Sequence, residues 1–163
     1  MLAYKFLGAG ALGTYSGFSW PVGEWIEVGA PLVPSRRGIH ACRVGDLPHW
    51  LDDELWRVEL KGDVLEEERM LVASRGRLLE RLEGWNAGVF EELADACVER
   101  SRPYPGWRED AAEWAAYPDR ISAVYIVAHA AGLASEAAGE RYASGFDAER
   151  AWQAAWIAER VGV

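Results

Sequence analysis

The residues best suited to chemistry lie together in the segment SRRGIHACRVGDLPH, residues 35–49. Histidine titrates near neutral pH, and arginine forms charge-assisted hydrogen bonds with carboxylates and phosphates. The segment therefore predicts a site that holds an anionic group beside a general acid or base. The candidate catalytic residue is His40, and the candidate ligand-binding residues are Arg36, Arg37, Arg43, Cys42 and His49.

Glu59, on the strand expected next, is the candidate residue that orients the His40 imidazole. Cys42 is either a nucleophile whose pKa the neighbouring arginines lower or a small buried residue. A tight turn at Gly38, with His40 bonded to the backbone, would explain the same residues without a function. We favour a site, because a chain of net charge −9 is expected to scatter its arginines and here gathers them around a histidine.

A second motif, Gly8-Ala9-Gly10-Ala11-Leu12-Gly13, has the G-x-G-x-x-G spacing of dinucleotide-binding proteins. That spacing binds a pyrophosphate only where a strand ends and a helix begins. Gly17, Pro21 and Gly23 follow closely, and such residues break helices. The sequence therefore predicts loop and strand over residues 13–24 and no dinucleotide site there.

Composition excludes several classes of function. The spacing H-x-C-x₆-H of His40, Cys42 and His49 matches no common zinc signature, so we predict no metal site. The net charge of −9 and the pI near 4.9 argue against an extended nucleic-acid surface. No apolar run reaches the length of a membrane span, and the amino terminus lacks the pattern of a signal peptide. We therefore expect a soluble cytoplasmic protein, and no cofactor is indicated.

Short strands and Gly/Pro turns are predicted from residue 1 to about residue 83. Residues 54–60 alternate clearly between apolar and polar side chains, as a half-buried strand does. Residues 76–83 fit either a strand or a helix, and we favour one long strand or two strands there. A polar turn is expected before them, at residues 61–68.

The second half of the chain is predicted to be helical. Asn86 is a good N-cap for a first helix that ends before Pro103. A short helix is expected over residues 109–117, after which Asp119 caps a strongly apolar helix and Asp147 caps the last one.

Strands followed by helices predict an α+β fold, with a curved, mainly antiparallel sheet in the N-terminal half and the helices packed on it. We expect one domain over residues 1–163, mainly β over 1–83 and mainly α over 86–163. Trp152 and Trp156 lie one turn apart and are expected to bury the last helix, and replacing either with alanine should cost roughly 3 to 5 kcal/mol if it is fully buried.

GIHACR, the strand LWRVELKGD and the segment MLVASRGRLL resemble a family of uncharacterised bacterial and phage proteins with a Gly-[Ile/Leu]-His-[Ala/Phe]-[Cys/Ser] motif. The resemblance covers about residues 5–100 and the last helix, and it is most specific over residues 37–62. The resemblance implies that His40 is important, but the family has no established activity.

The order of strand, Gly-Ile-His, short helix and hydrophobic strand is also loosely similar to NAD-using ADP-ribosyltransferases and RNA 2′-phosphotransferases. The chain departs from that layout, since the first strand has no second histidine or arginine. A likeness at fold level does not carry function by itself.

Two functions remain open. The first is a binding or accessory protein that engages a small anionic ligand or a protein partner through a sheet face or through an aromatic loop, whose residues are Tyr15, Phe18, Trp20 and Trp25. The second is a small enzyme that acts on an anionic ligand such as NAD or another nucleotide, with His40 as acid, base or orienting group.

Overall fold

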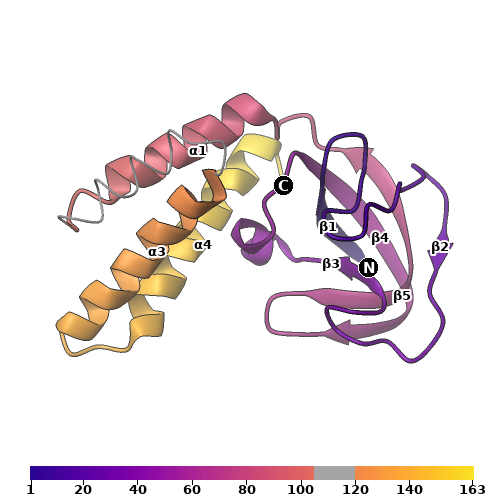
Figure 1. Cartoon of the computed structure of the whole chain (residues 1–163), viewed down its shortest axis with the longest axis horizontal. Helices are drawn as coiled ribbons and strands as arrows, with labels where there is room; N and C mark the ends of the chain where they lie inside the picture. Colours follow the sequence, from indigo (N-terminus) through magenta and orange to yellow (C-terminus); the bar gives the residue numbers. More distant parts are fainter. Residues whose placement is uncertain (105–119) are drawn as a thin grey trace. The chain divides into compact units, whose positions relative to one another are not determined.

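The computed structural model describes residues 1–104 and 120–163 (Figure 1). The chain divides into two compact units, which we describe one at a time: Met1–Trp85 together with Val161–Val163, and Asn86–Arg160. The first, here called the β-rich unit, holds the strands that the structure describes, and the second, the helical unit, holds long helices. The α+β class is therefore confirmed. One domain over residues 1–163 stays a prediction.

The β-rich unit is a strongly curved antiparallel sheet. Its strands are β1 (Leu2–Leu7), β2 (Ile26–Glu27), β3 (Ile39–Ala41), β4 (Glu54–Glu66) and β5 (Leu71–Arg81). Figure 1 shows β4 and β5 as long neighbouring strands; β1 pairs with β4, while β2 and β3 pair with successive parts of β5. Backbone hydrogen bonds of 2.9 and 2.8 Å between Tyr4 and Cys42 join β3 back to β1. Strands β1, β4, β5 and β3 thus close into a ring.

The hydrophobic core of the β-rich unit draws on alternate strand residues, because successive side chains of a strand point to opposite faces. Its buried members are Ala3, Leu7, Ala11, Ile39, Ala41, Trp56, Val58, Leu60, Leu71, Ala73 and Leu78. A 3₁₀ helix, η1 (Val44–His49), follows β3 and buries Leu47 and Pro48.

Of the two expectations about β4 and β5, one is confirmed and one is wrong. Strand β5 runs without interruption to Arg81, so the preference for strand over helix in residues 76–83 is confirmed up to that residue. The polar turn at residues 61–68 is wrong, because β4 continues to Glu66. The pairing shifts between Lys61 and Val64 and then resumes, which keeps the polar stretch in the strand.

The glycine-rich run does not open a helix. Residues 13–24 form turns and isolated bridges, so the prediction of a loop without a helix is confirmed, while the expected strand there is reduced to the bridges. The backbone amides of the run instead bind carboxylates of the same chain. Ala9 N donates to Asp53 Oδ2 at 3.0 Å, and Gly10 N and Ala11 N donate to the two oxygens of Glu54 at 3.0 and 3.1 Å.

Glu54 is the buried anchor of this loop. Its carboxylate also accepts hydrogen bonds from Trp56 Nε1 at 2.9 Å and Arg81 Nη1 at 3.1 Å. The glycine run therefore does bind an anion, as such backbone concavities do, but that anion is an internal side chain.

The bonds to Glu54 predict how stability depends on pH. Burial alone would raise the pKa of Glu54, but hydrogen bonds from Trp56, Gly10 and Ala11 and the charge of Arg81 hold the pKa below its usual 4.5. Such a carboxyl stabilises the fold above its unfolded pKa and loses that contribution as the pH falls through its folded pKa.

We therefore expect the stability difference between the wild type and Glu54→Gln to be largest near neutral pH and to shrink below about pH 4.5. Urea unfolding at neutral pH and at about pH 3 measures the difference. An equal difference at both pH values would contradict the assignment.

The helical unit contains α1 (Ala87–Arg100), α3 (Arg120–Ala137) and α4 (Tyr142–Val161). Figure 1 shows α3 and α4 side by side and running in opposite directions. None of the described helices is both long and apolar enough to cross a membrane.

The predicted helix starts have three outcomes. Asn86 is the N-cap of α1, since its side chain accepts hydrogen bonds from Gly88 N and Val89 N at 3.0 and 3.2 Å. The helix expected over residues 109–117 and its successor's cap, Asp119, lie outside the described residues. Asp147 is not a cap, because α4 already begins at Tyr142. The Tyr142 ring stacks on Phe146 at 5.5 Å, which holds that extra turn in place.

The expectation that Trp152 and Trp156 bury the last helix is wrong. Both are only partly buried, and each lies against an arginine, Arg100 at 4.0 Å and Arg160 at 4.6 Å from the ring centroids. The buried stripe of α4 lies beside them and includes polar side chains: Phe146, Glu149, Arg150, Gln153, Ala154, Ile157 and Ala158. Loss of either tryptophan should therefore cost less than loss of a fully buried one.

Candidate functional site

The candidate site is built on β3 and the turn that leads into it. Gly38 has φ +144°, and a Cβ there would overlap Val72 Cγ1, so only glycine fits. This close approach places His40 opposite Val72 in the β3–β5 ladder. Ile39 and Ala41 face the core on either side, and the His40 side chain therefore lies on the other face of the strand.

His40 is partly buried, and its Nε2 atom is buried without a hydrogen-bond partner among the described residues. Burial and the nearby charge of Lys5 lower the pKa of His40, against a backbone hydrogen bond at Gly38 that raises it. The imidazole is therefore neutral at neutral pH. In that form one ring nitrogen donates and the other accepts.

Lys5 is a member of the site that the sequence analysis missed. Its Nζ donates to the backbone oxygen of His40 at 2.7 Å and lies 4.9 Å from the centroid of the Trp20 ring. Burial lowers the pKa of Lys5 to about 8, although Cys42 opposes the shift. One sequence signal could have identified Lys5: it lies among apolar residues in AYKFL and shares the inward face of the strand with Ala3 and Leu7.

Cys42 lies at the end of β3 as a buried thiol. Burial, helped by Asp46, raises its pKa to about 12, and the charges of Lys5 and Arg43 only partly offset this. The hypothesis that neighbouring arginines lower this pKa is therefore wrong, and Cys42 is not a thiolate at neutral pH.

Arg43 is already committed to carboxylates. It pairs with Asp46 at 3.2 Å and Glu66 at 3.0 Å and donates to the backbone oxygen of Glu67 at 3.1 Å. His49 is partly buried in the last turn of η1, beyond the end of β3. Neither residue is brought to His40 by a contact that the structure shows.

Glu59 binds arginine and lysine instead of His40. Its carboxylate accepts from Arg77 Nε at 2.9 Å and pairs with Lys61 at 3.4 Å. The register explains this, because Glu59 on β4 faces Leu2 of β1 and Arg77 of β5, whereas β3 does not pair with β4. Glu59 is therefore not the residue that orients the imidazole.

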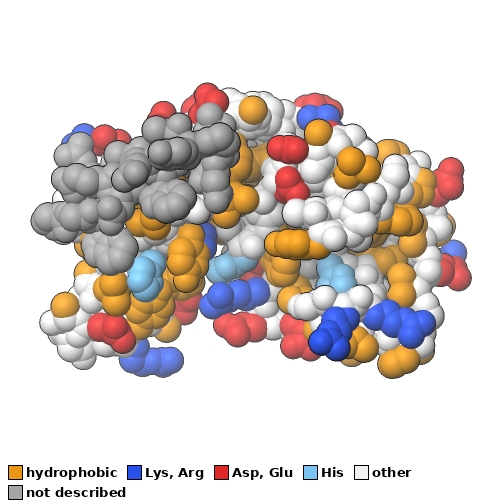
Figure 2. Space-filling view, in the orientation of Figure 1, with side chains coloured by type: hydrophobic (Ala, Val, Ile, Leu, Met, Phe, Trp, Pro, Cys, Tyr) orange, Lys and Arg blue, Asp and Glu red, His pale blue; other side chains and the backbone are white. Residues whose placement is uncertain are grey.

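Arg36 and Arg37 lie exposed in the turn before β3, which Val33 and Arg37 close by a backbone bridge. The basic side chains of the β-rich unit that form ion pairs are Arg43, Arg57, Lys61, Arg69, Arg75, Arg77 and Arg81. The remaining ones, Arg36, Arg37 and Lys5, have no carboxylate partner within the described ranges. Figure 2 shows Lys or Arg side chains gathered near a histidine over the β-rich unit.

Within residues 1–104 and 120–163 no three His, Cys, Asp or Glu side chains lie close enough together to hold a metal ion. Comparisons with protein-family models, with curated proteins and with solved structures give no match to this chain. The resemblance to the Gly-[Ile/Leu]-His-[Ala/Phe]-[Cys/Ser] family stays a prediction.

Proposed function

We propose that the chain is a binding protein for a small anionic ligand, with Arg36 and Arg37 as its anchoring cations and His40 as a hydrogen-bonding partner. The observation that supports this is the distribution of ion pairs. In an acidic chain, seven of the ten basic side chains of the β-rich unit have a carboxylate partner; of the three that have none among the described residues, Arg36 and Arg37 precede β3 and Lys5 bonds to the backbone oxygen of His40.

An anion at this site would meet three favourable conditions. The two exposed guanidinium groups of Arg36 and Arg37 can form bidentate hydrogen bonds with a carboxylate or phosphate. Lys5 adds positive charge from a partly buried position, where charge interactions are screened less than at the surface. His40 Nε2 is buried without a partner among the described residues, and it would accept a hydrogen bond from a protonated oxygen of the ligand if binding opened access to it.

Binding is favoured over catalysis because the catalytic set is incomplete. Glu59 is held by Arg77 and Lys61, and Cys42 is protonated at neutral pH. The second candidate is an enzyme acting on an anionic ligand such as NAD or another nucleotide, with His40 as the acid or base. The neutral imidazole, whose Nε2 atom has no partner among the described residues, favours it. His40→Ala would then abolish turnover while leaving most of the binding to the arginines.

We also propose that the protein is cytoplasmic and that it belongs to the family with the Gly-[Ile/Leu]-His-[Ala/Phe]-[Cys/Ser] motif. Alternatively, the β-rich unit binds a protein partner through its aromatic loop, in which Tyr15 is 94% and Phe18 47% exposed.

A thermal-shift measurement at constant ionic strength tests the proposal with inorganic phosphate, AMP and NAD as probes. We expect at least one probe to raise the melting temperature, because a ligand at 100 times its Kd adds about 2.7 kcal/mol to the native state. The double variant Arg36→Ala/Arg37→Ala should melt like the wild type without ligand and lose the response. The matched control is Arg57→Ala, which removes a partly exposed arginine paired with Glu80 and should keep the response.

Failure of all three probes to shift the wild type would argue against an anion site. So would a double variant that responds as well as the wild type, or an equal loss of response in Arg57→Ala.

A further inference from the structure

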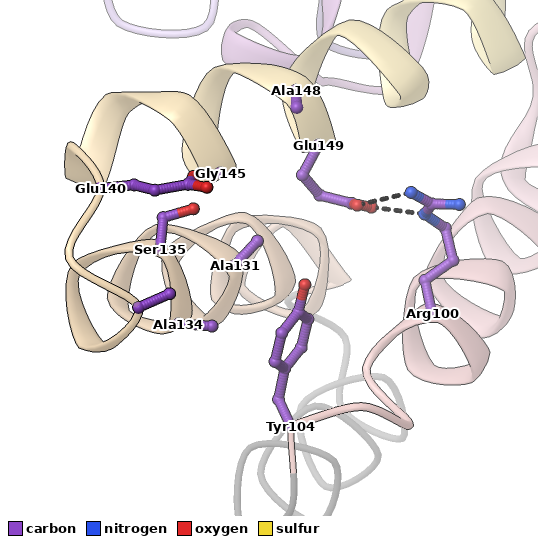
Figure 3. A pocket seen from close by; sticks show the side chains of 10 residues that line it. Arg100, Tyr104, Ala131, Ala134, Ser135, Glu140, Gly145, Ala148 and Glu149 are labelled. Carbon is purple, nitrogen blue, oxygen red and sulfur yellow. Dashed lines mark hydrogen bonds and ion pairs between the residues drawn. The ribbon is translucent and has the colours of Figure 1, made fainter.

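The helical unit contains a pocket of about 380 Å³ (Figure 3). Its walls come from the end of α1 and the residues after it, from the second half of α3 and from the first turns of α4. The volume is in the range of small-molecule sites. The residues of the candidate anion site belong to the other unit, so this pocket is independent of the proposed function.

Small residues make the pocket hollow. Helices α3 and α4 touch at Gly145, where a Cβ would overlap the backbone oxygen of Ala131. The floor is formed by alanines such as Ala131 and Ala134, whose methyl groups are too short to fill the space beside that contact. These alanine methyl groups are the apolar part of a pocket whose exposed lining is mainly polar, and a short alkyl chain would lie against them.

The rim of the pocket is rich in oxygen atoms. Figure 3 shows Ser135 and Glu140 on one side of the pocket, with their oxygens turned into it, and the Tyr104 hydroxyl facing the pocket from another side, whereas the Glu149 carboxylate turns toward Arg100. Both carboxylate oxygens of Glu149 accept from Arg100, at 2.8 and 2.7 Å, so this pair is already neutral. Glu140 is exposed and forms no ion pair with any described residue. The uncompensated charge of the pocket is therefore negative.

We propose that this pocket binds a small organic amine, whose ammonium group pairs with Glu140 and whose alkyl chain lies over the alanine floor. Ser135 accepts a second hydrogen bond from the ammonium group, since a primary ammonium carries three donors. The Tyr104 hydroxyl offers a further acceptor away from Glu140, which suits a second amino group. A metal cation is a poorer match, because no three metal-binding side chains gather within the described part of the chain. An anion is disfavoured, since Arg100 is committed to Glu149.

Calorimetric titration of the full chain with 1,4-diaminobutane tests this site, with 1,4-butanediol as the neutral isostere. We expect saturable binding of the diamine and none of the diol. Glu140→Gln should weaken binding by up to about fivefold, because it removes the charge that pairs with the ammonium group at an exposed position. Glu136→Gln is the matched control, as it removes an exposed carboxylate from α3 outside the pocket and should bind like the wild type.

Ala134→Leu fills the floor and should also abolish binding, provided that circular dichroism shows the helices intact. Absence of saturable binding to the wild type would overturn the proposal. Wild-type affinity in Glu140→Gln, or equal weakening in Glu136→Gln, would do the same.

Discussion

Replacing Glu54 with alanine is expected to lower the free energy of unfolding of the β-rich unit by about 3 to 5 kcal/mol. Glu54 is 6% exposed, and its carboxylate accepts from two backbone amides, from Trp56 Nε1 and from Arg81. Truncation leaves all of these donors without their partner, and buried unpaired groups are costly. Urea unfolding followed by circular dichroism measures the loss.

The matched control for this substitution is Glu80→Ala, which also removes a carboxylate paired with an arginine, Arg57. Glu80 is exposed, and surface ion pairs contribute only about 0 to 1 kcal/mol. Equal losses in the two variants would show that the glycine loop is not anchored by Glu54.

The second large effect is expected at Trp85, the last residue of the β-rich unit's main segment. Its side chain is 1% exposed, packs edge-to-face on Phe6 at 5.2 Å and donates from Nε1 to the backbone oxygen of Asp52 at 2.8 Å. Trp85→Ala should cost roughly 3 to 5 kcal/mol, since it opens a cavity and strands a buried acceptor.

Trp25→Ala is the control for Trp85, because Trp25 is partly buried under Lys61, Arg75 and Arg77 at the surface. Its loss should cost clearly less in the same urea experiment. A Trp85→Ala variant as stable as the Trp25→Ala variant would contradict the core that we describe.

The sequence predicted those features that depend on local pattern. Alternation fixed strands such as β4, and the N-cap chemistry of Asn86 fixed the start of α1. The closely spaced Gly17, Pro21 and Gly23 excluded a helix after the glycine run. Each of these conclusions needs only residues that are neighbours along the chain.

Features that depend on distant partners were not predictable. Arg43 binds Glu66, and Glu59 binds Arg77, through the register of the sheet, which no local spacing reveals. Lys5 approaches His40 because β3 bridges back to β1, a closure made by residues far apart in sequence. The register of the last helix, where a stripe beside Trp152 is the buried one, follows from packing within the helical unit.

The residues assigned to the candidate site differ between the sequence analysis and the structure. His40, Arg36 and Arg37 remain as candidates, Lys5 joins them, and Arg43 and Glu59 are engaged in ion pairs elsewhere. What remains is Arg36, Arg37 and Lys5, which have no carboxylate partner among the described residues, beside a neutral imidazole, and this suits recognition of an anion more than proton transfer.

The most direct test of the anion site is the nuclear magnetic resonance signal of the His40 imidazole during a titration with inorganic phosphate at constant ionic strength. The chain has three histidines, so His49 and His129 serve as internal controls, and His40→Ala assigns the signal. We expect a saturable shift of the His40 signal that disappears in Arg36→Ala/Arg37→Ala and persists in Arg57→Ala. An unchanged His40 signal at saturating phosphate, or a shift that survives loss of both arginines, would contradict an anion site at β3.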